Sequence, residues 1–168
     1  MTPESASAIA AAAQVLDAGG VVVMPTDTVY GLAARPDRPQ AVKRLYELKG
    51  RDGGKPIALL VSDASMLSGK ARELADRYWP GALTIVAGGE GYRMPDDEVA
   101  LDLIARCGGA LRVTSANLSG AGDSDEAPAD LGADYVLDAG KSKLGRASTV
   151  VKVDGDTITV LREGAIKL

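Results

Sequence analysis

The 168-residue chain contains no histidine, and this absence removes more mechanisms than any other feature of its composition. An imidazole base, a histidine metal ligand and the Ser–His and Cys–His catalytic pairs are all excluded. A single cysteine, Cys107, excludes an intramolecular disulfide and a Cys-x-x-Cys metal site. If the chain is an enzyme, it works mainly by positioning its substrates and by electrostatics.

Two familiar classes of segment are also missing. The chain has no Gly-x-x-x-x-Gly-Lys-Ser/Thr run and no complete Gly-x-Gly-x-x-Gly run, so the common nucleotide-binding fingerprints do not apply. No stretch approaches 18 uninterrupted apolar residues, and residues 1–5 lack the basic region of a secretory signal. We therefore expect no membrane span, and the single cysteine favours a reducing, cytoplasmic location.

What is present is the composition of one ordinary globular domain, which we predict to cover residues 1–168, with 46% hydrophobic and 25% charged residues. A net charge of −4 argues against a surface coated in basic residues for nucleic acid. A local basic cleft is still expected, because seven cations fall within 21 residues: Arg35, Arg38, Lys43, Arg44, Lys49, Arg51 and Lys55. Such a cleft suits a phosphate-bearing small molecule, although a solvated helix face explains Arg38, Lys43 and Arg44 equally well.

Hydrophobic periodicity predicts alternating helices and strands. Helical spacing covers residues 6–18, 40–48, 64–77 (where Gly69 permits a break) and 97–107. The first of these helices is expected to start with Thr2 as its N-cap and Pro3 at the first helical position, and to end at Gly19 and Gly20. Short apolar or alternating runs predict strands at residues 21–24, 57–61, 83–87, 110–113, 135–137, 149–153 and 157–161. A hairpin turn is expected at residues 154–156 and a flexible loop at residues 88–91. Together these elements predict an α/β fold with an open mixed sheet and flanking helices.

Three polar segments follow predicted elements. Residues 24–32, Met-Pro-Thr-Asp-Thr-Val-Tyr-Gly-Leu, place two threonine hydroxyls at the C-terminal end of a strand, where ligands of α/β sheets bind. Residues 49–51, Lys-Gly-Arg, follow an amphipathic helix, and residues 114–120, Thr-Ser-Ala-Asn-Leu-Ser-Gly, follow a strand. In this order and spacing, the three segments resemble the L-threonylcarbamoyladenylate synthase family, the YrdC-like domain. The resemblance extends over about residues 8–166.

The resemblance implies an open twisted sheet with a ligand cleft on one face, and an ATP-dependent synthase. Its members join L-threonine, bicarbonate and ATP into L-threonylcarbamoyl-AMP with release of pyrophosphate. The product is the activated donor for t6A modification of tRNA. The resemblance also implies Mg²⁺ as a cofactor that is held mainly by the ATP phosphates, and it assigns the ion no protein ligand. Proteins that transfer the group to tRNA are the implied partners.

The resemblance also implies roles for individual residues. For threonine it indicates Thr28, Arg93, Ser148 and, through its backbone, Val113. For the nucleotide it indicates Lys49 and Arg51, which are also the expected catalytic pair, and with them Lys55, Ser115, Asn117, Ser124 (or Asp123) and Arg162. Taken alone, these residues have ordinary interpretations: strand-end turn hydroxyls, solvated loop cations, and a helix cap or Asx-turn.

Four departures from the family pattern are visible. Only twelve positions separate Gly81 from Arg93, about half the usual number, so we expect a hairpin beside the site to be shortened or deleted. Leu60 replaces a common histidine, and residues 96–98, Asp-Asp-Glu, replace another. Glu163 stands where proline is usual, and could neutralise Arg162.

Two other interpretations stay open, and the shortened segment before Arg93 and the missing histidines support the first of them. The first is a non-catalytic protein of the same fold that binds nucleotide or double-stranded RNA, including tRNA, in the basic cleft. The second is a carbamoyl-transfer domain of the hydrogenase-maturation type. That domain is usually embedded in a longer chain with zinc-finger and acylphosphatase modules.

Overall fold

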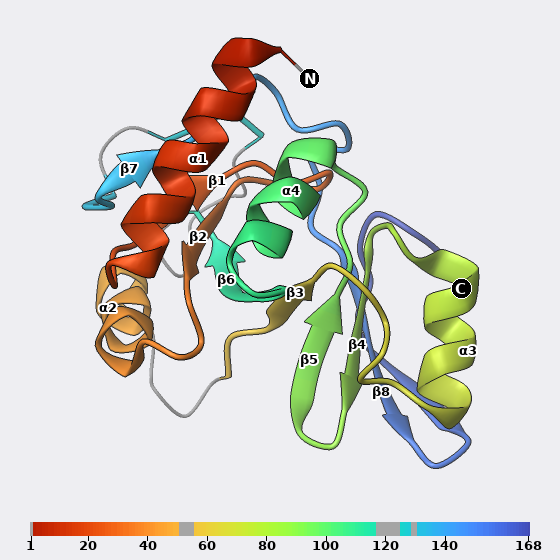
Figure 1. Ribbon diagram of the computed structural model, residues 1–168. Coiled ribbons are helices and arrows are strands. Elements are labelled where there is room, and N and C mark those ends of the chain that lie inside the picture. Colours follow the sequence, from red (N-terminus) through yellow and green to blue (C-terminus); the bar gives the residue numbers. More distant parts are fainter. Residues whose placement is uncertain (1, 51–55, 117–124, 129–130) are drawn as a thin grey trace.

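The computed structural model describes residues 2–50, 56–116, 125–128 and 131–168, whose strands form one open sheet flanked by helices (Figure 1). The helices are α1 (Pro3–Asp17), α2 (Pro39–Lys49), α3 (Gly69–Tyr78) and α4 (Glu98–Arg106). The strands are β1 (Val22–Met24), β2 (Gly31–Ala34), β3 (Leu59–Val61), β4 (Leu83–Ala87), β5 (Glu90–Arg93), β6 (Ala110–Ser115), β7 (Tyr135–Val136), β8 (Thr149–Asp154) and β9 (Thr157–Arg162). No helix within these described ranges is both long and apolar enough to cross a bilayer.

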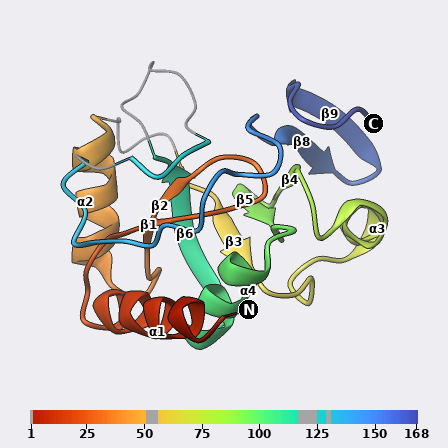
Figure 2. The same cartoon turned by 90° about the horizontal axis from the view of Figure 1, so that it is seen from above.

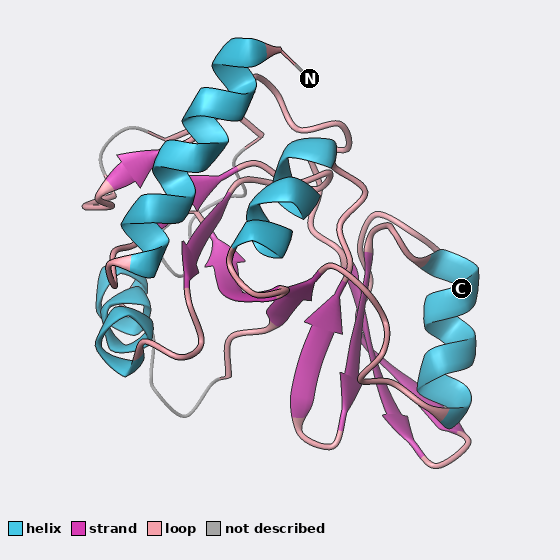
Figure 3. Ribbon diagram, viewed as in Figure 1, coloured by secondary structure: helices cyan, strands magenta, loops and turns pink. Residues whose placement is uncertain are grey.

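The sheet is mixed, with the strand order β7-β1-β2-β6-β3-β5-β4-β8-β9. The pairs β1–β7, β3–β5 and β4–β8 are parallel, and the other neighbours are antiparallel. Consecutive strands form hairpins at β1–β2, β4–β5 and β8–β9, and the last two stand next to each other in the sheet (Figure 3). The predicted α/β fold with an open mixed sheet is therefore confirmed.

Register decides which residues share a face of the sheet, because directly paired residues point the same way. One face carries Ala33, Leu60 and Leu111, which pack with Leu16 of α1 and Leu103 of α4. Figure 2 shows α1 and α4 together on this side of the strands. This face is therefore called the α1–α4 face.

The opposite face is covered by the other two helices. Leu32 and Ala34 pack against Leu45 of α2. Further along the sheet, Ile85 and Val151 pack against α3. The α1–α4 face of β4, β5 and β8 has no comparable helix among the contacts recorded for the described elements. That region of the sheet is where the site described below lies.

Local sequence signals explain several helix ends. The Thr2 hydroxyl accepts a hydrogen bond from the Ser5 amide at 3.0 Å and caps α1, and Asp97 caps α4 through the Ala100 amide at 2.8 Å. Gly50 ends α2 in a left-handed conformation with φ 62°. These ends agree with the predicted helices to within about two residues, the usual uncertainty of such boundaries.

Three sequence-based expectations were wrong in detail. Residues 90–91, expected in a flexible loop, belong to β5, and only Gly88 and Gly89 form the turn. Both glycines have positive φ (61° and 80°), as a two-residue hairpin turn of type I′ requires. The helix expected from residue 64 begins at Gly69, and the strand β2 was not predicted. The hairpin before Arg93 is therefore present, with a minimal turn.

Candidate functional site

A cavity of about 300 Å³ lies on the α1–α4 face, over β2, β3, β4, β5, β6 and β8. Its polar lining side chains come from strands or from turns next to them: Thr26, Thr28, Tyr30, Thr84, Arg93, Thr114, Ser115, Ser148 and Arg162. Its apolar lining residues include Leu60, Val86, Val113 and Val150. The cavity thus joins an apolar floor to a polar rim, the usual character of a small-molecule site.

The turn after β1 has a fixed pattern of hydrogen bonds. The Thr26 hydroxyl donates its one hydrogen to the Val29 carbonyl at 2.6 Å and accepts from the Thr28 amide at 3.1 Å. The Thr26 and Thr28 hydroxyl oxygens lie 3.0 Å apart. Because the Thr26 hydrogen is already used, Thr28 must be the donor in this bond. Thr26 is then saturated and holds the turn in shape.

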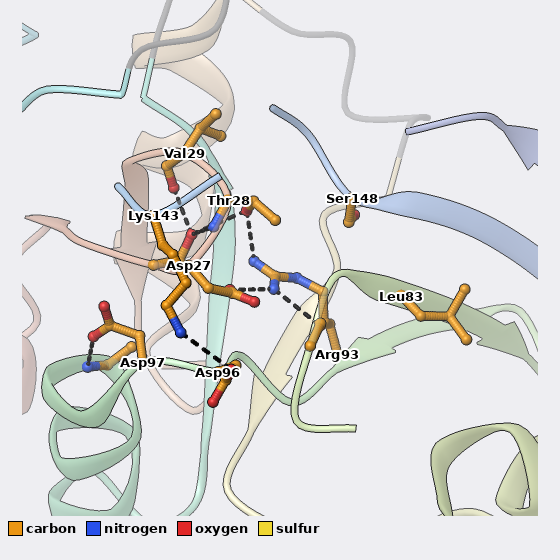
Figure 4. Close-up of polar contacts among 12 residues, drawn as sticks. Asp27, Thr28, Val29, Leu83, Arg93, Asp96, Asp97, Lys143 and Ser148 are labelled. Carbon is orange, nitrogen blue, oxygen red and sulfur yellow. Dashed lines mark hydrogen bonds and ion pairs between the residues drawn. The ribbon is translucent and has the colours of Figure 1, made fainter. Parts of the chain in front are cut away.

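Arg93, at the end of β5, reaches this turn although β2, β6 and β3 lie between β1 and β5 in the sheet (Figure 4). Its Nη1 donates to Asp27 Oδ1 at 2.6 Å and to the Gly81 carbonyl at 3.2 Å, and its Nη2 donates to Thr28 Oγ1 at 2.9 Å. Arg93 is 5% exposed and Asp27 2% exposed. The ion pair offsets the cost of burying each charge, which unpaired would be several kcal/mol.

Counting donors and acceptors shows what the cavity can bind here. A guanidinium has five N–H donors, and described residues take three of those of Arg93, which leaves Nε–H and one hydrogen of Nη2. Thr28 donates its hydrogen to Thr26 and accepts from Arg93, so its oxygen keeps one lone pair. Two donors therefore lie beside one acceptor. A carboxylate with a neighbouring amine, as in an α-amino acid, complements this arrangement.

A second polar group lies on another wall of the cavity. The Thr84 and Ser148 hydroxyl oxygens are 2.8 Å apart, and both side chains are buried. Arg162 of β9 donates from Nε and Nη2 to the Ser148 carbonyl, at 3.1 and 2.8 Å, and from Nη2 to Ser148 Oγ at 3.2 Å. A cation from the last strand is thus tied to the hydroxyls beside the apolar floor.

Lys49, the last residue of α2, is 4% exposed. Its Nζ donates to the carbonyl of Ser115 at 3.0 Å and to Ser115 Oγ at 3.2 Å. Ser115 itself lines the cavity. The two segments that the sequence singled out around residues 49 and 115 therefore meet at one point of the structure.

Above the threonine turn runs the connection from β7 to β8. The Tyr30 hydroxyl donates to the Gly140 carbonyl at 2.6 Å and accepts from the Ala139 amide at 3.0 Å. Burial raises the pKa of Tyr30, so the phenol stays protonated and keeps donating at neutral pH. The Leu144 amide donates to the Asp27 carbonyl at 2.9 Å. These bonds fix the connection that leads to Ser148.

Six of the predicted site residues line the one cavity: Thr28, Arg93, Val113, Ser115, Ser148 and Arg162. Lys49 adjoins it through Ser115. Arg51, Lys55, Asn117 and Ser124 lie outside the described residues. Leu60, which replaces a family histidine, contributes to the apolar floor.

Asp27 and Thr84, whose side chains bond to Arg93 and Ser148, were not predicted as site residues, and neither were the lining residues Tyr30 and Thr114. Asp27 lies between the two threonines. The one indication of a role in the sequence is that a carboxylate stands in a segment otherwise typical of a buried strand end. Thr84 is the hydroxyl residue in the apolar run of β4, Leu-Thr-Ile-Val-Ala. Neither signal identifies a partner, because Arg93 and Ser148 are more than 60 residues away.

Comparison with known proteins decides the family. A sequence model of the family that comprises Sua5, YciO and YrdC, described as "Telomere recombination", matches residues 14–164. The chain belongs to this family. The resemblance seen in the sequence is thereby confirmed.

Individual relatives agree with this assignment. A threonylcarbamoyl-AMP synthase from Bacillus subtilis is 37% identical over 94% of this chain and 54% of its own length. A relative from Mycobacterium tuberculosis is 38% identical over 98% of this chain and 88% of its own length. The chain thus spans about half of the first relative and most of the second.

Solved structures agree as well. A crystal structure of Pyrococcus abyssi Sua5 complexed with L-threonine matches with a TM-score of 0.86 and 31% identity, over 93% of this chain and 54% of that protein. Escherichia coli YciO matches with a TM-score of 0.81 over 97% of this chain and 91% of that protein; at 22% identity it supports the fold alone.

Proposed function

We propose that this protein is an L-threonylcarbamoyladenylate synthase, made of one domain over residues 1–168 and acting in the cytoplasm. It would join L-threonine, bicarbonate and ATP for t6A modification of tRNA. The observation that carries the proposal is the unused hydrogen-bonding capacity beside Arg93, two donors next to the one acceptor of Thr28. The names of the relatives and the threonine complex of the P. abyssi protein support it.

In the proposed complex, the threonine carboxylate accepts from Nε and Nη2 of Arg93, as a bidentate pair. The amine donates one N–H to Thr28 Oγ1. The side chain of the substrate then faces the apolar floor near Val113 and Leu60, with Ser148 and Thr84 beside it. This pose uses every hydrogen-bonding position that the buried turn leaves open.

The reaction balances in two steps. Threonine and bicarbonate give the N-carbamate, water and one proton, which passes to solvent. A carbamate oxygen then forms a bond to the α-phosphorus of ATP while the bond to the pyrophosphate oxygen breaks. The carbamate is already an anion, so the second step needs no general base, which suits a chain without histidine. Pyrophosphate leaves.

The cations serve the phosphates in this proposal. Lys49 and Arg162 approach the cavity from α2 and β9, and Arg51 and Lys55 are assigned from the resemblance alone, as are Asn117 and Ser124. Fixed positive charge near a phosphoryl group offsets the charge that develops during transfer. In this proposal Mg²⁺ enters with ATP and is held mainly by its phosphates; within the described residues no three carboxylate or thiol side chains gather into a metal site.

The test is pyrophosphate release from ATP with threonine and bicarbonate, each omitted in turn. Release that requires both is the expected result. Lys49→Ala combined with Arg51→Ala should abolish ATP binding while the thermal transition remains cooperative. ATP binding with no pyrophosphate under any condition would refute the synthase, and titration with double-stranded RNA at several salt concentrations would then test the non-catalytic alternative.

A further inference from the structure

The buried ion pair between Asp27 and Arg93 restricts how the arginine can meet a ligand. Nη1 has two hydrogens, and both are taken, one by Asp27 Oδ1 at 2.6 Å and one by the Gly81 carbonyl at 3.2 Å. With the partners that the described residues supply, only Nε and Nη2 of this guanidinium keep a hydrogen for the cavity. These two nitrogens form one edge of the planar guanidinium and suit the two oxygens of a carboxylate.

We propose that Asp27 is a positioning residue, which turns the Nε–Nη2 edge of Arg93 toward the cavity and thereby sets the affinity for the substrate carboxylate. The proposal rests on the proposed function for the identity of the substrate, threonine. Asp27 does not line the cavity and acts only through Arg93. Figure 4 shows its carboxylate on the side of the guanidinium away from Ser148.

Rigidity of the surroundings supports a positioning role. Asp27 is 2% exposed, and its backbone carbonyl accepts the Leu144 amide at 2.9 Å. The adjacent Thr28 is held by Thr26, which is itself saturated. An arginine has four rotatable side-chain bonds, and an anchor of fixed position removes most of that freedom before the ligand arrives. Without it, Thr28 Oγ1 and the Gly81 carbonyl would be the remaining partners of the guanidinium among the described residues, and neither carries a charge.

The experiment compares Asp27→Ala and Asp27→Asn with wild type in steady-state pyrophosphate release. Asp27→Ala removes the anchor, and we expect the KM for threonine to rise at least tenfold while the KM for ATP stays within twofold. Asp27→Asn keeps an acceptor oxygen of the same reach, and we expect an intermediate KM for threonine. It also preserves side-chain volume, so it keeps the test valid if the alanine variant does not fold.

A matched control breaks an ion pair on the same strand. Glu90 of β5 pairs with Arg112, and neither residue lines the cavity. Glu90→Ala should lower the melting temperature somewhat and leave both KM values unchanged. A rise in the threonine KM equal to that of Asp27→Ala would show that any loss of charge pairing in β5 has this effect, and would overturn the proposal.

A second measurement does not depend on turnover. In ¹⁵N-labelled protein, the Nε–H signal of Arg93, assigned by its disappearance in Arg93→Lys, should shift when L-threonine is added. L-threoninamide, which lacks the carboxylate, should leave it in place. In Asp27→Ala the response to threonine should be lost at the same ligand concentration.

The outcomes separate the two claims. A wild type that neither binds threonine nor releases pyrophosphate refutes the proposed function. A wild type that does both, beside an Asp27→Ala variant with an unchanged or lower threonine KM, refutes only the role of Asp27. Equal losses of threonine and ATP affinity also refute it, because they indicate a general disturbance of the fold.

Discussion

Among the glycines that the structure describes, Gly164 is the one where an added methyl group would meet the most backbone atoms at short range. The chain turns back there after β9 and lies against the segment that carries Ser148. A Cβ at Gly164 would lie 2.4 Å from the Ser148 carbonyl carbon and oxygen and 2.5 Å from the Ala147 oxygen. All three are backbone atoms, so no rotamer change relieves the overlap, and Gly164→Ala must displace one segment from the other.

The cost follows from two terms. Overpacking of this kind costs about 1–3 kcal/mol. The displacement also weakens the hydrogen bond from the Gly164 amide to Thr149 Oγ1, now 3.1 Å, which contributes about 1 kcal/mol. The sum is about 2–4 kcal/mol, and at roughly 2–4 °C per kcal/mol for a chain of this size the melting temperature should fall by roughly 4–16 °C.

Thermal unfolding followed by circular dichroism measures the effect, with Gly91→Ala as the control. Neither glycine has a positive φ, so backbone conformation is not the difference between them. At Gly91 the nearest atom to a new Cβ is the Ala58 side-chain carbon at 3.3 Å, and the cost should stay below about 1 kcal/mol. A Gly164→Ala protein that melts within 2 °C of wild type, or no lower than Gly91→Ala, would refute the packing argument.

Three further outcomes are expected. Thr84→Val keeps the shape of the side chain but removes the hydroxyl bonded to Ser148, so kcat/KM for threonine in pyrophosphate release should fall about tenfold. Thr84→Ser restores a hydroxyl and should recover the activity; equal activity of wild type, Thr84→Val and Thr84→Ser would contradict this. Tyr30→Phe leaves the Gly140 carbonyl and the Ala139 amide without their partner, at about 1–3 kcal/mol, and urea unfolding should show the loss. Burial raises the pKa of Cys107 to about 11, so at pH 8 only about one thiol in a thousand is ionised. Mass spectrometry should therefore find slow alkylation by iodoacetamide in the native protein and rapid alkylation in urea, whereas rapid native labelling would show that the thiol is not sequestered.

The sequence predicts the helices and most strands of this protein because each has a local signal. Helical periodicity marks α1, α2 and α4, and buried apolar runs mark β1, β3 and β4. The strand β5 was not predicted because its sequence, Glu-Gly-Tyr-Arg after two glycines, has the composition of a loop. It is a strand only because β3 and β4 pair with it on both sides. That stabilisation is tertiary, and no local pattern contains it.

The candidate site, like the fold, could be predicted only where a local sequence pattern marks a residue. The sequence motifs predicted that four side chains bind threonine or the nucleotide, and all four line the cavity: Thr28, Ser115, Ser148 and Arg162. The bonds that set their donors and acceptors could not be predicted. Thr84 meets Ser148 because β8 pairs with β4, and Asp27 meets Arg93 although β2, β6 and β3 separate β1 from β5 in the sheet. The residue type determines which hydrogen-bond donors and acceptors a side chain has. The strand pairing determines which of them are bonded within the protein and which remain for a ligand.

The short β4–β5 hairpin shows why a departure from the family pattern need not disturb the site. The Gly88–Gly89 turn closes the far end of the hairpin, whereas Arg93 lies at its base, one residue beyond Tyr92, the partner of Ile85. Pairs removed at the tip leave the pairing at the base unchanged, so Arg93 keeps the face of the sheet that it shares with Leu60. Gly89 of this turn and Gly91 of β5 form part of the cavity wall without a side chain. A ligand there meets backbone, and the selectivity of this wall must come from its shape and its peptide groups.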